Sequence, residues 1–553
     1  MLDVFIIGGG PAGALAALLL GTRDVGPAIN APPGTQPPST NGKSAASVRV
    51  TLVEGGAPPA ASLSGGRSFS YLIGPRGAAA LSRVPALLSA VRAAGVPSRP
   101  LAITSLGTDG RVSVNPDLGR ALQTRSATEP EPGTWLHRNV FMRLLYDALD
   151  EAVAAEEGGK RLRVRTGMSC VGLVAPFAPL TDEDVSRERR VAVPVDDDDD
   201  SREESVAFSS EATSAMATDA DGRAVLTLRN NVTGAEEVVR PDLVIGADGA
   251  RSVVRSALGG ALGYKAPEEF SRLYPSPAAD VAYRTLALKA SPLLAFDGSL
   301  SAQPGMMYVC KGRSFNMGML CVGSDPSLPR IGTVTQPMSS PLWQLSTVDE
   351  YWTAFEENFP TLPLREMVAE GAMEAFAAGL TVTFPTPLMP EALGGGVGTT
   401  GVVLTGDAAH TFPPDLGQGV NAALEDVGVL VDLLDEGGSA GAAAVAGTSP
   451  VTLAVAYHAS RRDDVAALIR MMQVGAPYQY GQDKLRRAAW GLGVVARVRL
   501  ANVAPALCAP PVFTAVNTTV PYSEIWRQEK ATKRRLLGGV LAVAATVAAV
   551  LAR

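Results

Sequence analysis

Residues 3–20 of the chain read DVFIIGGGPAGALAALLL. The apolar run Val4–Ile7 is typical of a short buried strand, and the apolar stretch after Pro11 favours a helix that begins at the proline. The glycines between them permit a tight turn, a close approach of a pyrophosphate to the backbone, and close packing of helix on strand. These glycines, in the spacing G-x-G-x-x-G, are Gly8, Gly10 and Gly13. The stretch therefore predicts the opening unit of a dinucleotide-binding α/β domain.

A second strand supports this interpretation. Residues 47–54, SVRVTLVE, end in Glu54, an acid placed to accept a hydrogen bond from a ribose hydroxyl. The acid lies further from the glycines than the usual gap of about 20 residues. Residues 21–46, rich in Pro, Gly, Ser and Asn, account for the excess as a predicted disordered surface insertion. A chance glycine run is the alternative, and the strand on each side argues against it.

Residues 241–255, PDLVIGADGARSVVR, repeat the order of strand, turn and helix. The apolar run Leu243–Ile245 predicts a buried strand. Asp248 and Gly249 then form a turn, and a helix starts near Arg251.

Residues 406–430, GDAAHTFPPDLGQGVNAALEDVGVL, show the order a third time. They follow the apolar run Val402–Thr405, and from Gly419 onward the apolar residues keep a helical period. Such a loop points backbone N–H groups and the positive end of a helix dipole at something small and electron-rich. Because ligands collect at the carboxyl ends of parallel strands, we expect all three turns at one site. The glycine run near Gly394 is predicted to be a loop before a strand.

Composition narrows the class of protein. With 553 residues, 46% of them hydrophobic, the chain can form two or more domains with sizeable cores. The net charge of −7 argues against a nucleic-acid partner. Four cysteines and three histidines without metal-ligand spacing predict no metal site and suit a reducing compartment. Residues 181–221 include the acidic run DDDDDSREES, which predicts a solvated loop.

Residues 536–552 carry no charge and no proline, and they follow the basic run Lys533–Arg535. This length is at the short end of what crosses a bilayer. With no N-terminal signal, we expect a tail-anchored protein whose body faces the cytosol, in the outer mitochondrial membrane or the endoplasmic reticulum. The alternative is a terminal helix docked on the protein itself.

The order of these motifs, with GADGARSVVR and GDAAHTFPPDLGQGVNAALED, resembles the single-component FAD-dependent aromatic hydroxylases. The resemblance implies an α/β fold in which a Rossmann-type FAD-binding domain is interleaved with a substrate domain built on a mixed or antiparallel sheet. A helical C-terminal region and a terminal apolar helix follow. The implied division is an FAD-binding domain in three parts (1–85, 135–262 and 398–475), substrate-domain segments (86–134 and 263–397), a C-terminal helical region (476–532) and a membrane anchor (533–553).

The resemblance also implies which residues hold the cofactor. The first glycines and the acid would hold the ADP part of FAD, and the turn at Gly406 would reach the ribityl chain. The loop and helix start near Gly419 would lie against the isoalloxazine, and the turn at Asp248 would form a second fingerprint. The implied cofactor-binding residues are Gly8, Gly10, Gly13, Glu54, Arg138, Asp248, Gly249, Arg251, Gly406, Asp407, Gly417, Gln418, Gly419, Val420 and Asn421.

The implied activity is a monooxygenase reaction. NADPH or NADH would reduce FAD, and dioxygen would form a peroxyflavin that hydroxylates a small, electron-rich, aromatic substrate. A membrane-associated flavin reductase or epoxidase acting on an isoprenoid is an alternative, as is a flavin-binding module without turnover.

Within the family, the kynurenine 3-monooxygenases are the most similar branch. The segments that carry this likeness are GRSFSYLIGPRGAAAL (66–81), WLHRNVFMRLL (135–145) and FTAVNTTVPYSEIWRQEK (513–530). The arginine that binds the substrate carboxylate in that branch is replaced here by Leu101, with Arg99 nearby as a weak candidate substitute. Asn115 or Pro116 stands where that branch has a tyrosine.

Several single residues can also be interpreted from the sequence. His410 either relays a proton beside the flavin or, as we favour, packs in its turn. Asp415 is predicted to cap the following helix. Arg461 and Arg462 are predicted to lie on a solvated helix face. Two further arginines could be surface charges or lie near the cofactor; they are Arg67 and Arg76.

Overall fold

The structure is a computed structural model. It describes residues 2–22, 48–57, 69–98, 103–115, 132–155, 161–175, 222–303, 306–320, 322–439, 449–480 and 483–551. The predicted acidic insertion lies outside these residues, as does all but the start of the insertion at 21–46.

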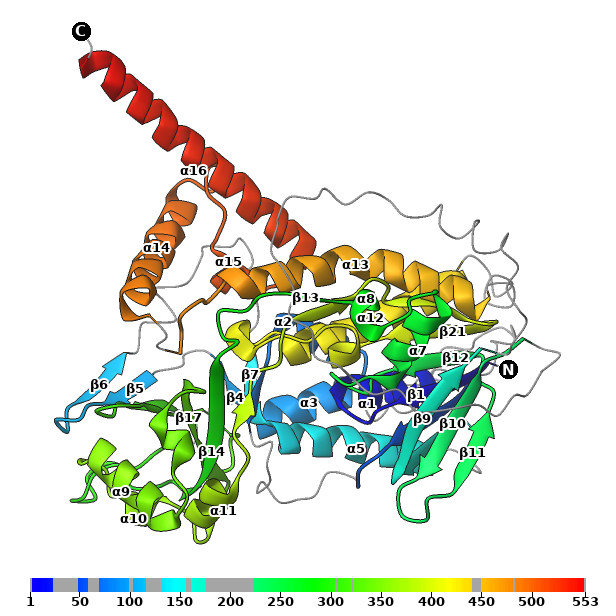
Figure 1. Cartoon of the computed structure of the whole chain (residues 1–553), viewed down its shortest axis with the longest axis horizontal. Helices are drawn as coiled ribbons and strands as arrows, with labels where there is room; N and C mark the ends of the chain where they lie inside the picture. The colour runs from blue at the N-terminus through cyan, green and yellow to red at the C-terminus, as the bar shows by residue number, and fades with distance from the viewer. Residues whose placement is uncertain are drawn as a thin grey trace, which may run out of the picture.

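A six-stranded sheet forms the centre of the molecule (Figure 1). Its order is β20 (Gly394–Val397), β21 (Thr400–Leu404), β12 (Leu243–Gly246), β1 (Leu2–Ile7), β2 (Val48–Glu54) and β8 (Leu162–Thr166). All neighbours are parallel except β20 and β21. The strands predicted from the apolar runs at 4–7, 243–245 and 402–405 are therefore confirmed, and they are adjacent.

The prediction of a loop near Gly394 was wrong, because these glycines form strand β20. A side chain at Gly394 would place its Cβ 2.3 Å from the Ala454 carbonyl oxygen. The glycine therefore lets helix α13 pack directly against the strand, a tertiary requirement that local sequence does not reveal.

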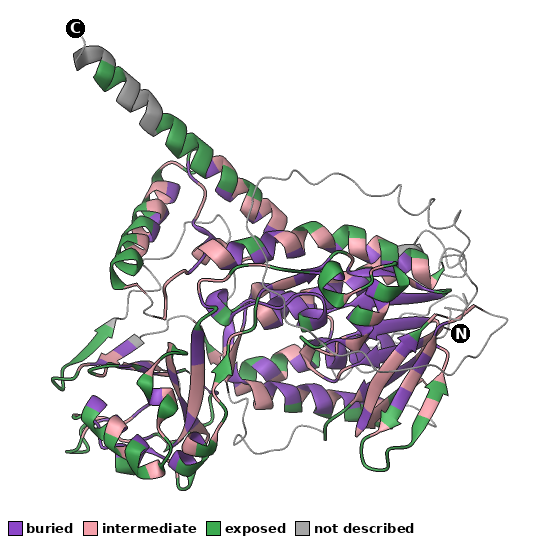
Figure 2. Ribbon diagram, in the orientation of Figure 1, coloured by how far each residue is buried: buried purple, intermediate pink, exposed green. Residues whose placement is uncertain are grey.

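Helices cover the central sheet and bury its strands. They are α1 (Pro11–Gly21), α5 (Arg138–Ala155), α7 (Val253–Ala261), α12 (Gly419–Ser439) and α13 (Pro450–Val474). The inner strands are buried along almost their whole length, as Figure 2 shows, which is typical of a parallel sheet covered on both faces. The helices predicted from Gly419 and from Pro450 are confirmed.

A second sheet of seven strands has its own hydrophobic core. Its order is β18 (Val382–Thr383), β14 (Val281–Ala290), β17 (Pro329–Pro337), β16 (Met317–Met319), β15 (Met307–Cys310), β5 (Ile103–Leu106) and β6 (Val112–Asn115). Only β15 and β5 pair in parallel, so the sheet is mixed, as the resemblance implied. The elements beside it are η3 (Pro341–Gln344), α9 (Val348–Asn358), α10 (Leu364–Met367) and α11 (Ala372–Ala378). The exact domain bounds stay a prediction.

The described residues also form three small sheets. The first contains β3 (Ser70–Ile73), β7 (Thr134–His137) and β4 (Val96–Pro97), with α2 (Pro75–Leu81) and α3 (Pro85–Ala94) beside it. The second contains β9 (Met168–Val174), β10 (Val225–Asn230) and β11 (Glu236–Val239). The third pairs β13 (Ser271–Leu273) with β19 (Leu388–Pro390), next to α8 (Pro267–Phe270).

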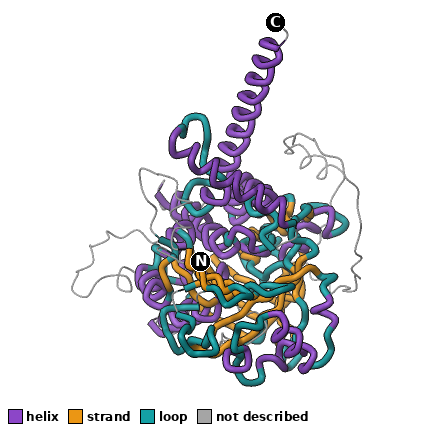
Figure 3. The backbone as a smooth tube through the Cα atoms, turned by 90° about the vertical axis from the view of Figure 1, so that its left-hand side faces the viewer, coloured by secondary structure: helices purple, strands orange, loops and turns teal. Residues whose placement is uncertain are grey.

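The C-terminal region is helical, with α14 (Lys484–Val503), α15 (Val512–Ala515) and α16 (Tyr522–Leu551). The start of α16 packs against α13, and the rest stands out from the body (Figures 1 and 3). Its residues 533–539 are exposed, so the docked-helix alternative is not seen there. Across the described part of the chain, no helix combines the length and the apolar character that crossing a membrane requires. The predicted membrane anchor is therefore not supported.

Candidate cofactor site

The three predicted turns lie together at one edge of the central sheet. β12 lies between β1 and β21, and all three run in the same direction. Backbone hydrogen bonds continue past the strand ends, from Ala247 N to Ile7 O at 2.8 Å and from Thr405 N to Gly246 O at 2.8 Å. The turns therefore meet where ligands bind in open α/β sheets.

The first turn fits a dinucleotide residue by residue. Gly8 has a φ of +105°, and a Cβ there would lie 2.2 Å from the Ala247 carbonyl oxygen. A Cβ at Gly13 would lie 1.8 Å from the Gly8 carbonyl oxygen, so the helix can approach the turn only without a side chain. A Cβ at Gly10 would meet no atom within 4 Å. The outer two glycines thus build the turn, and the middle one leaves its backbone open to a pyrophosphate.

Glu54 lies at the end of β2, beside this turn. Its Oε2 accepts a hydrogen bond from Gly9 N at 2.6 Å and its Oε1 accepts one from Gly56 N at 2.7 Å. The carboxylate is therefore fixed in place by backbone donors. The Tyr146 hydroxyl donates to the Gly9 carbonyl oxygen at 3.2 Å, and burial, followed by the charge of Glu54, raises the pKa of Tyr146. Sequence analysis missed Tyr146, because nothing near residue 146 indicates a contact with residue 9.

The second turn uses its acid to cap a helix. Asp248 accepts hydrogen bonds from Ser252 Oγ at 2.5 Å and from Val253 N at 2.7 Å, at the start of α7. Burial raises the pKa of Asp248, and these hydrogen bonds only partly oppose the shift. Gly249 has a φ of +78° with open space at its Cβ position. Arg251, the third residue of the predicted fingerprint, is exposed.

Arg255 connects the second turn to the third, a role that the sequence did not reveal. Its Nη2 donates to Ala250 O at 2.6 Å and its Nη1 donates to Ala408 O at 3.0 Å. Burial lowers the pKa of Arg255, while Asp248 and Asp407 oppose that effect.

The third turn is a 3-10 helix, η4 (Gly406–Ala408), in which Gly406 has a φ of +57°. Its neighbours on both sides are buried, but Asp407 is exposed. Asp407 is thus the acidic side chain that this turn presents outward, as the resemblance requires for a ribityl contact.

The segment Pro413–Gln418, which we call the 413–418 loop, leads into α12 and contains η5 (Pro414–Leu416). Gly417 has a φ of +63°, and a Cβ at Gly417 or Gly419 would meet no atom within 4 Å. The first N–H groups of α12 have no acceptor within the helix itself, and its dipole is positive at this end. The backbone here is therefore open to a flat, electron-rich group.

The remaining predicted residues at the start of α12 are buried. Asn421 accepts from Gly74 N at 2.7 Å and donates to Leu72 O at 2.8 Å and Gly417 O at 3.0 Å. Its side chain therefore ties the loop to the β3–α2 turn. Val420, one residue earlier, belongs to the main hydrophobic core.

The prediction that Asp415 caps α12 was wrong. Its Oδ1 accepts from Tyr480 Oη at 2.8 Å and from Gln479 Nε2 at 3.0 Å. Burial raises the pKa of Asp415, and these two partners lower it. The left-handed Gly417 separates Asp415 from the helix start, so the side chain turns to the segment after α13 instead.

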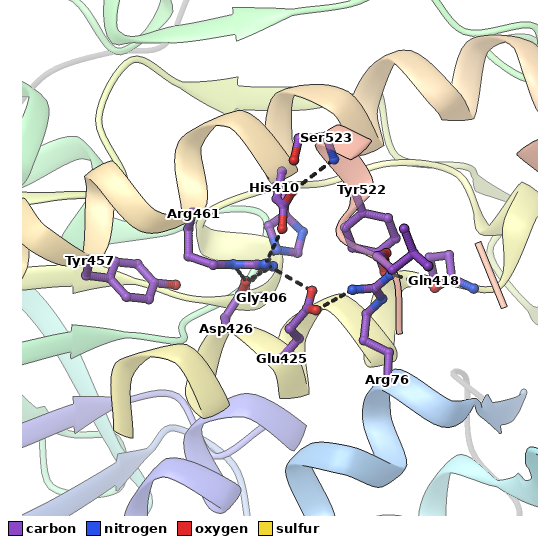
Figure 4. A network of polar contacts seen from close by, with 12 residues as sticks. Arg76, Gly406, His410, Gln418, Glu425, Asp426, Tyr457, Arg461, Tyr522 and Ser523 are labelled. Atoms are coloured by element: carbon purple, nitrogen blue, oxygen red, sulfur yellow. Dashed lines mark hydrogen bonds and ion pairs between the residues drawn. The ribbon is translucent and has the colours of Figure 1, made fainter. Parts of the chain in front are cut away.

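A buried ionic network joins α12 to α13 beside Gly406 of the third turn (Figure 4). Asp426 accepts from Gly406 N at 2.8 Å and pairs with Arg461 at 2.7 Å, and both side chains are almost completely buried. Arg461 also pairs with Glu425 at 2.9 Å. The prediction that Arg461 lies on a solvated face was therefore wrong, because acids on α12 meet it inside the protein. Arg462 is half-buried.

His410 belongs to the same network. Its Nε2 lies 2.8 Å from Asp426 Oδ2, and its backbone N–H donates to Gly406 O at 2.9 Å. Its Nδ1 has no hydrogen-bond partner among the described residues. This arrangement matches the interpretation that His410 packs in its turn.

Arg76 is buried, pairs with Glu425 and is not a surface charge. Arg138 begins α5, where its backbone N–H donates to Phe69 O at 3.0 Å. Asn115 ends the edge strand β6. Four residues that the sequence singled out lie outside the described part of the chain: Arg67, Arg99, Leu101 and Pro116.

A cavity of about 410 Å³ lies between α2, α3, β7 and residues 518–520. None of its lining residues belongs to the three turns or to the 413–418 loop. The candidate cofactor site is therefore at the strand-end turns and not at this cavity.

The chain is similar to several known proteins. The family model described as "FAD binding domain" matches residues 196–316 and 398–472. Kynurenine 3-monooxygenase 3 of Aspergillus niger is 29% identical over 208 residues, which are 36% of this chain and 36% of that protein. Kynurenine 3-monooxygenase of Salinispora arenicola is 32% identical over 154 residues, which are 27% of this chain and 31% of that protein. The chain thus matches about a third of the length of these relatives.

Among solved structures, a ternary complex of aklavinone-11 hydroxylase with FAD and aklavinone has a similar fold. Its TM-score is 0.52 at 17% identity, over 87% of this chain and 69% of that chain.

Proposed function

The chain belongs to the family of FAD-dependent aromatic hydroxylases, and on this premise we propose that it uses NADPH or NADH and dioxygen to hydroxylate a small aromatic molecule. The observation that carries the proposal is the meeting of three turns at one sheet edge, with open backbone at Gly10, Gly417 and Gly419. Bound FAD, once reduced, supplies the chemistry that activates dioxygen and transfers one oxygen atom.

The protein's own groups would bind the cofactor and orient it. The backbone at Gly10 would approach the pyrophosphate, and Glu54 with Tyr146 would hold that turn in shape. Asp407 would bind the sugar-alcohol chain between the two halves of the cofactor. The N-terminal end of α12 would stabilise negative charge on the reduced ring by its dipole and N–H groups.

The substrate is proposed by chemical class only. The relatives are named for kynurenine, but Leu101 replaces the arginine that would pair with the carboxylate of such a substrate. We therefore propose an electron-rich aromatic compound whose recognition does not depend on that ion pair. Localisation at a cytosol-facing membrane stays a prediction without structural support.

The experiment is an oxygen-incorporation assay on the purified holoprotein. We expect one equivalent of FAD per chain and NAD(P)H oxidation that rises with one aromatic compound in a panel. The product should carry one oxygen-18 atom when the assay contains ¹⁸O₂. NAD(P)H oxidation without labelled product would favour the flavin reductase alternative, and a labelled epoxide from an isoprenoid would favour the epoxidase. FAD binding without any turnover would favour a non-catalytic module, and a chain without FAD affinity would contradict the proposal.

A further inference from the structure

The side chain of Gln418, the last residue of the 413–418 loop, is held from both ends by a segment about 100 residues later. We call this segment, Asn517–Ser523, the C-terminal latch. The Gln418 Oε1 accepts a hydrogen bond from the Tyr522 hydroxyl at 2.9 Å. Its Nε2 donates to Leu416 O at 3.2 Å and to Asn517 Oδ1 at 3.4 Å. Gln418 is 2% exposed, so water does not replace these partners.

Tyr522 is itself fixed in place. Its side chain is fully buried, and the Arg76 guanidinium lies 3.8 Å from the centre of its ring. Arg76 also donates from Nη2 to Val520 O at 2.6 Å and forms an ion pair with Glu425. These contacts fix the orientation of the ring, so that its hydroxyl points to Gln418.

The latch also reaches the network behind the third turn. Ser523 N donates to Asp464 Oδ1 at 2.9 Å, and Asp464 lies 3.5 Å from Arg461. Arg461 holds Asp426, which accepts from Gly406 N. The latch is thus connected both to the 413–418 loop and to the turn that carries Asp407 (Figure 4).

We propose that Tyr522 is a positioning residue for the cofactor site, which acts through Gln418 on the backbone at the start of α12. The proposal rests on the proposed function, because that backbone matters only if a flavin lies against it. Since α16 begins at Tyr522 and extends away from the body, the first turn of α16 becomes part of the cofactor site's support. By linkage, FAD binding should in turn order the latch.

The test compares Tyr522→Phe with Tyr351→Phe in the full-length protein. Tyr351 is also fully buried and its hydroxyl accepts one hydrogen bond, from Arg284 at 2.8 Å, but it lies in the core of the second sheet. We expect Tyr522→Phe to weaken FAD binding about tenfold, measured by flavin fluorescence titration, because a buried acceptor loses its donor. Tyr351→Phe should leave FAD affinity within about twofold of wild type. This should hold even if it lowers the melting temperature as much as Tyr522→Phe does.

A double-mutant cycle separates positioning from general destabilisation. Gln418→Asn shortens the side chain, so that its amide no longer reaches Tyr522. Gln418→Asn also disturbs the bonds to Leu416 and Asn517, but both variants remove the hydrogen bond between Tyr522 and Gln418, so their losses in FAD affinity should add up to less than the sum. Hydrogen exchange at residues 519–523 should slow when FAD is added to wild type and slow less in Tyr522→Phe.

The outcomes distinguish this proposal from the proposed function. If wild type binds no FAD, the proposed function fails. If wild type binds FAD and Tyr522→Phe binds it equally well, or if the double variant loses the full sum of the two single losses, the positioning role is wrong. Should Tyr522→Phe fail to fold, Asn517→Ala removes the weaker partner at 3.4 Å and must still lower FAD affinity for the proposal to stand.

Discussion

At the scale of single residues, the three glycines of the first turn have different structural roles. Gly8 and Gly13 are required by the protein's own backbone, because a Cβ at either position would overlap a carbonyl oxygen. Gly10 has an ordinary φ of −67° and open space around it. Nothing in the described chain requires its lack of a side chain, which leaves space at the turn that a bound dinucleotide would occupy.

This difference predicts that two substitutions differ in their effect on the melting temperature, although both weaken FAD binding. Gly10→Ala should keep the melting temperature of the apoprotein but weaken FAD binding by about tenfold or more, because the methyl group enters the pyrophosphate's space. Gly13→Ala should lower both, since its Cβ would lie 1.8 Å from the Gly8 carbonyl oxygen. Thermal unfolding and flavin fluorescence measure the two effects. Gly260→Ala on α7, where a Cβ also meets nothing, is the control and should change neither by much. Unchanged FAD affinity in Gly10→Ala would contradict the assignment of this turn.

Asp426 gives a second residue-scale prediction. Burial alone would raise the pKa of Asp426. The charges of His410 and Arg461 outweigh this effect, so the pKa lies below that of an ordinary aspartate. Such a carboxylate stabilises the fold above its unfolded-state pKa of about 3.9, and that contribution is lost as the pH falls through the folded-state value. Asp426→Asn should therefore reduce the unfolding free energy by about 3 kcal/mol at pH 7, because the buried Arg461 loses its closest acid and keeps only Glu425 and the more distant Asp464. Below about pH 4 the gap to wild type should shrink.

Urea unfolding at pH 7 and pH 3.5 checks this result. The control is Asp432→Asn, which removes an exposed ion pair with Arg83 and should cost only about 0–1 kcal/mol. Equal losses in the two variants at pH 7 would show that the buried network does not stabilise the fold.

At the scale of elements, the strands β9 and β10 explain how a long insertion can be tolerated. They pair antiparallel, and Val174 near the end of β9 lies opposite Val225 at the start of β10. The predicted acidic insertion connects these two strand ends, which the sheet already holds side by side. The entropic cost of closing a loop between two fixed ends grows only slowly with the length of the loop.

Deleting residues 194–219 should therefore leave the hairpin, the melting temperature and the FAD content nearly unchanged. Residues on both sides of the deletion still provide enough chain to connect the paired ends. Differential scanning calorimetry and flavin absorbance measure the outcome. A large loss of either quantity would show that the acidic segment contributes to the structure.

At the scale of the whole molecule, the cofactor edge belongs to the central sheet, and the second sheet has its own separate core. Under the proposed function, this separation would let substrate recognition change while the cofactor site stays the same. By the resemblance, the expected departure from the kynurenine 3-monooxygenases is at Leu101, where the substrate carboxylate would bind.

Kynurenine should therefore not accelerate reduction of the flavin by NADPH when present at micromolar concentration. A lost charged contact costs about 1.5–3 kcal/mol, or roughly ten- to a hundredfold in affinity. Stopped-flow absorbance measures the reduction rate, and Leu101→Arg is the matched variant that should improve the response. Fast, saturable formation of 3-hydroxykynurenine by wild type would refute the prediction and indicate that Arg99 replaces the missing arginine.

The sequence by itself determined the central sheet's inner strands, the order of the three turns, and the helices that begin at Pro11, Gly419 and Pro450. These features depend on neighbouring residues, because apolar runs, glycine spacing and helical periodicity act over a few residues. Their meeting at one edge followed from parallel strands, which bring their carboxyl ends together.

Only the tertiary structure decided what the buried polar residues do. Arg461 resembles a solvated charge in sequence, yet acids on another helix neutralise it inside the protein. Asp415 resembles a helix cap in sequence, yet it accepts a hydrogen bond from the Tyr480 hydroxyl and not from the helix. Gln418 depends on Tyr522, which comes from the far end of the chain. A polar group is stable in the interior only beside its partner, and chain folding, not local sequence, selects that partner.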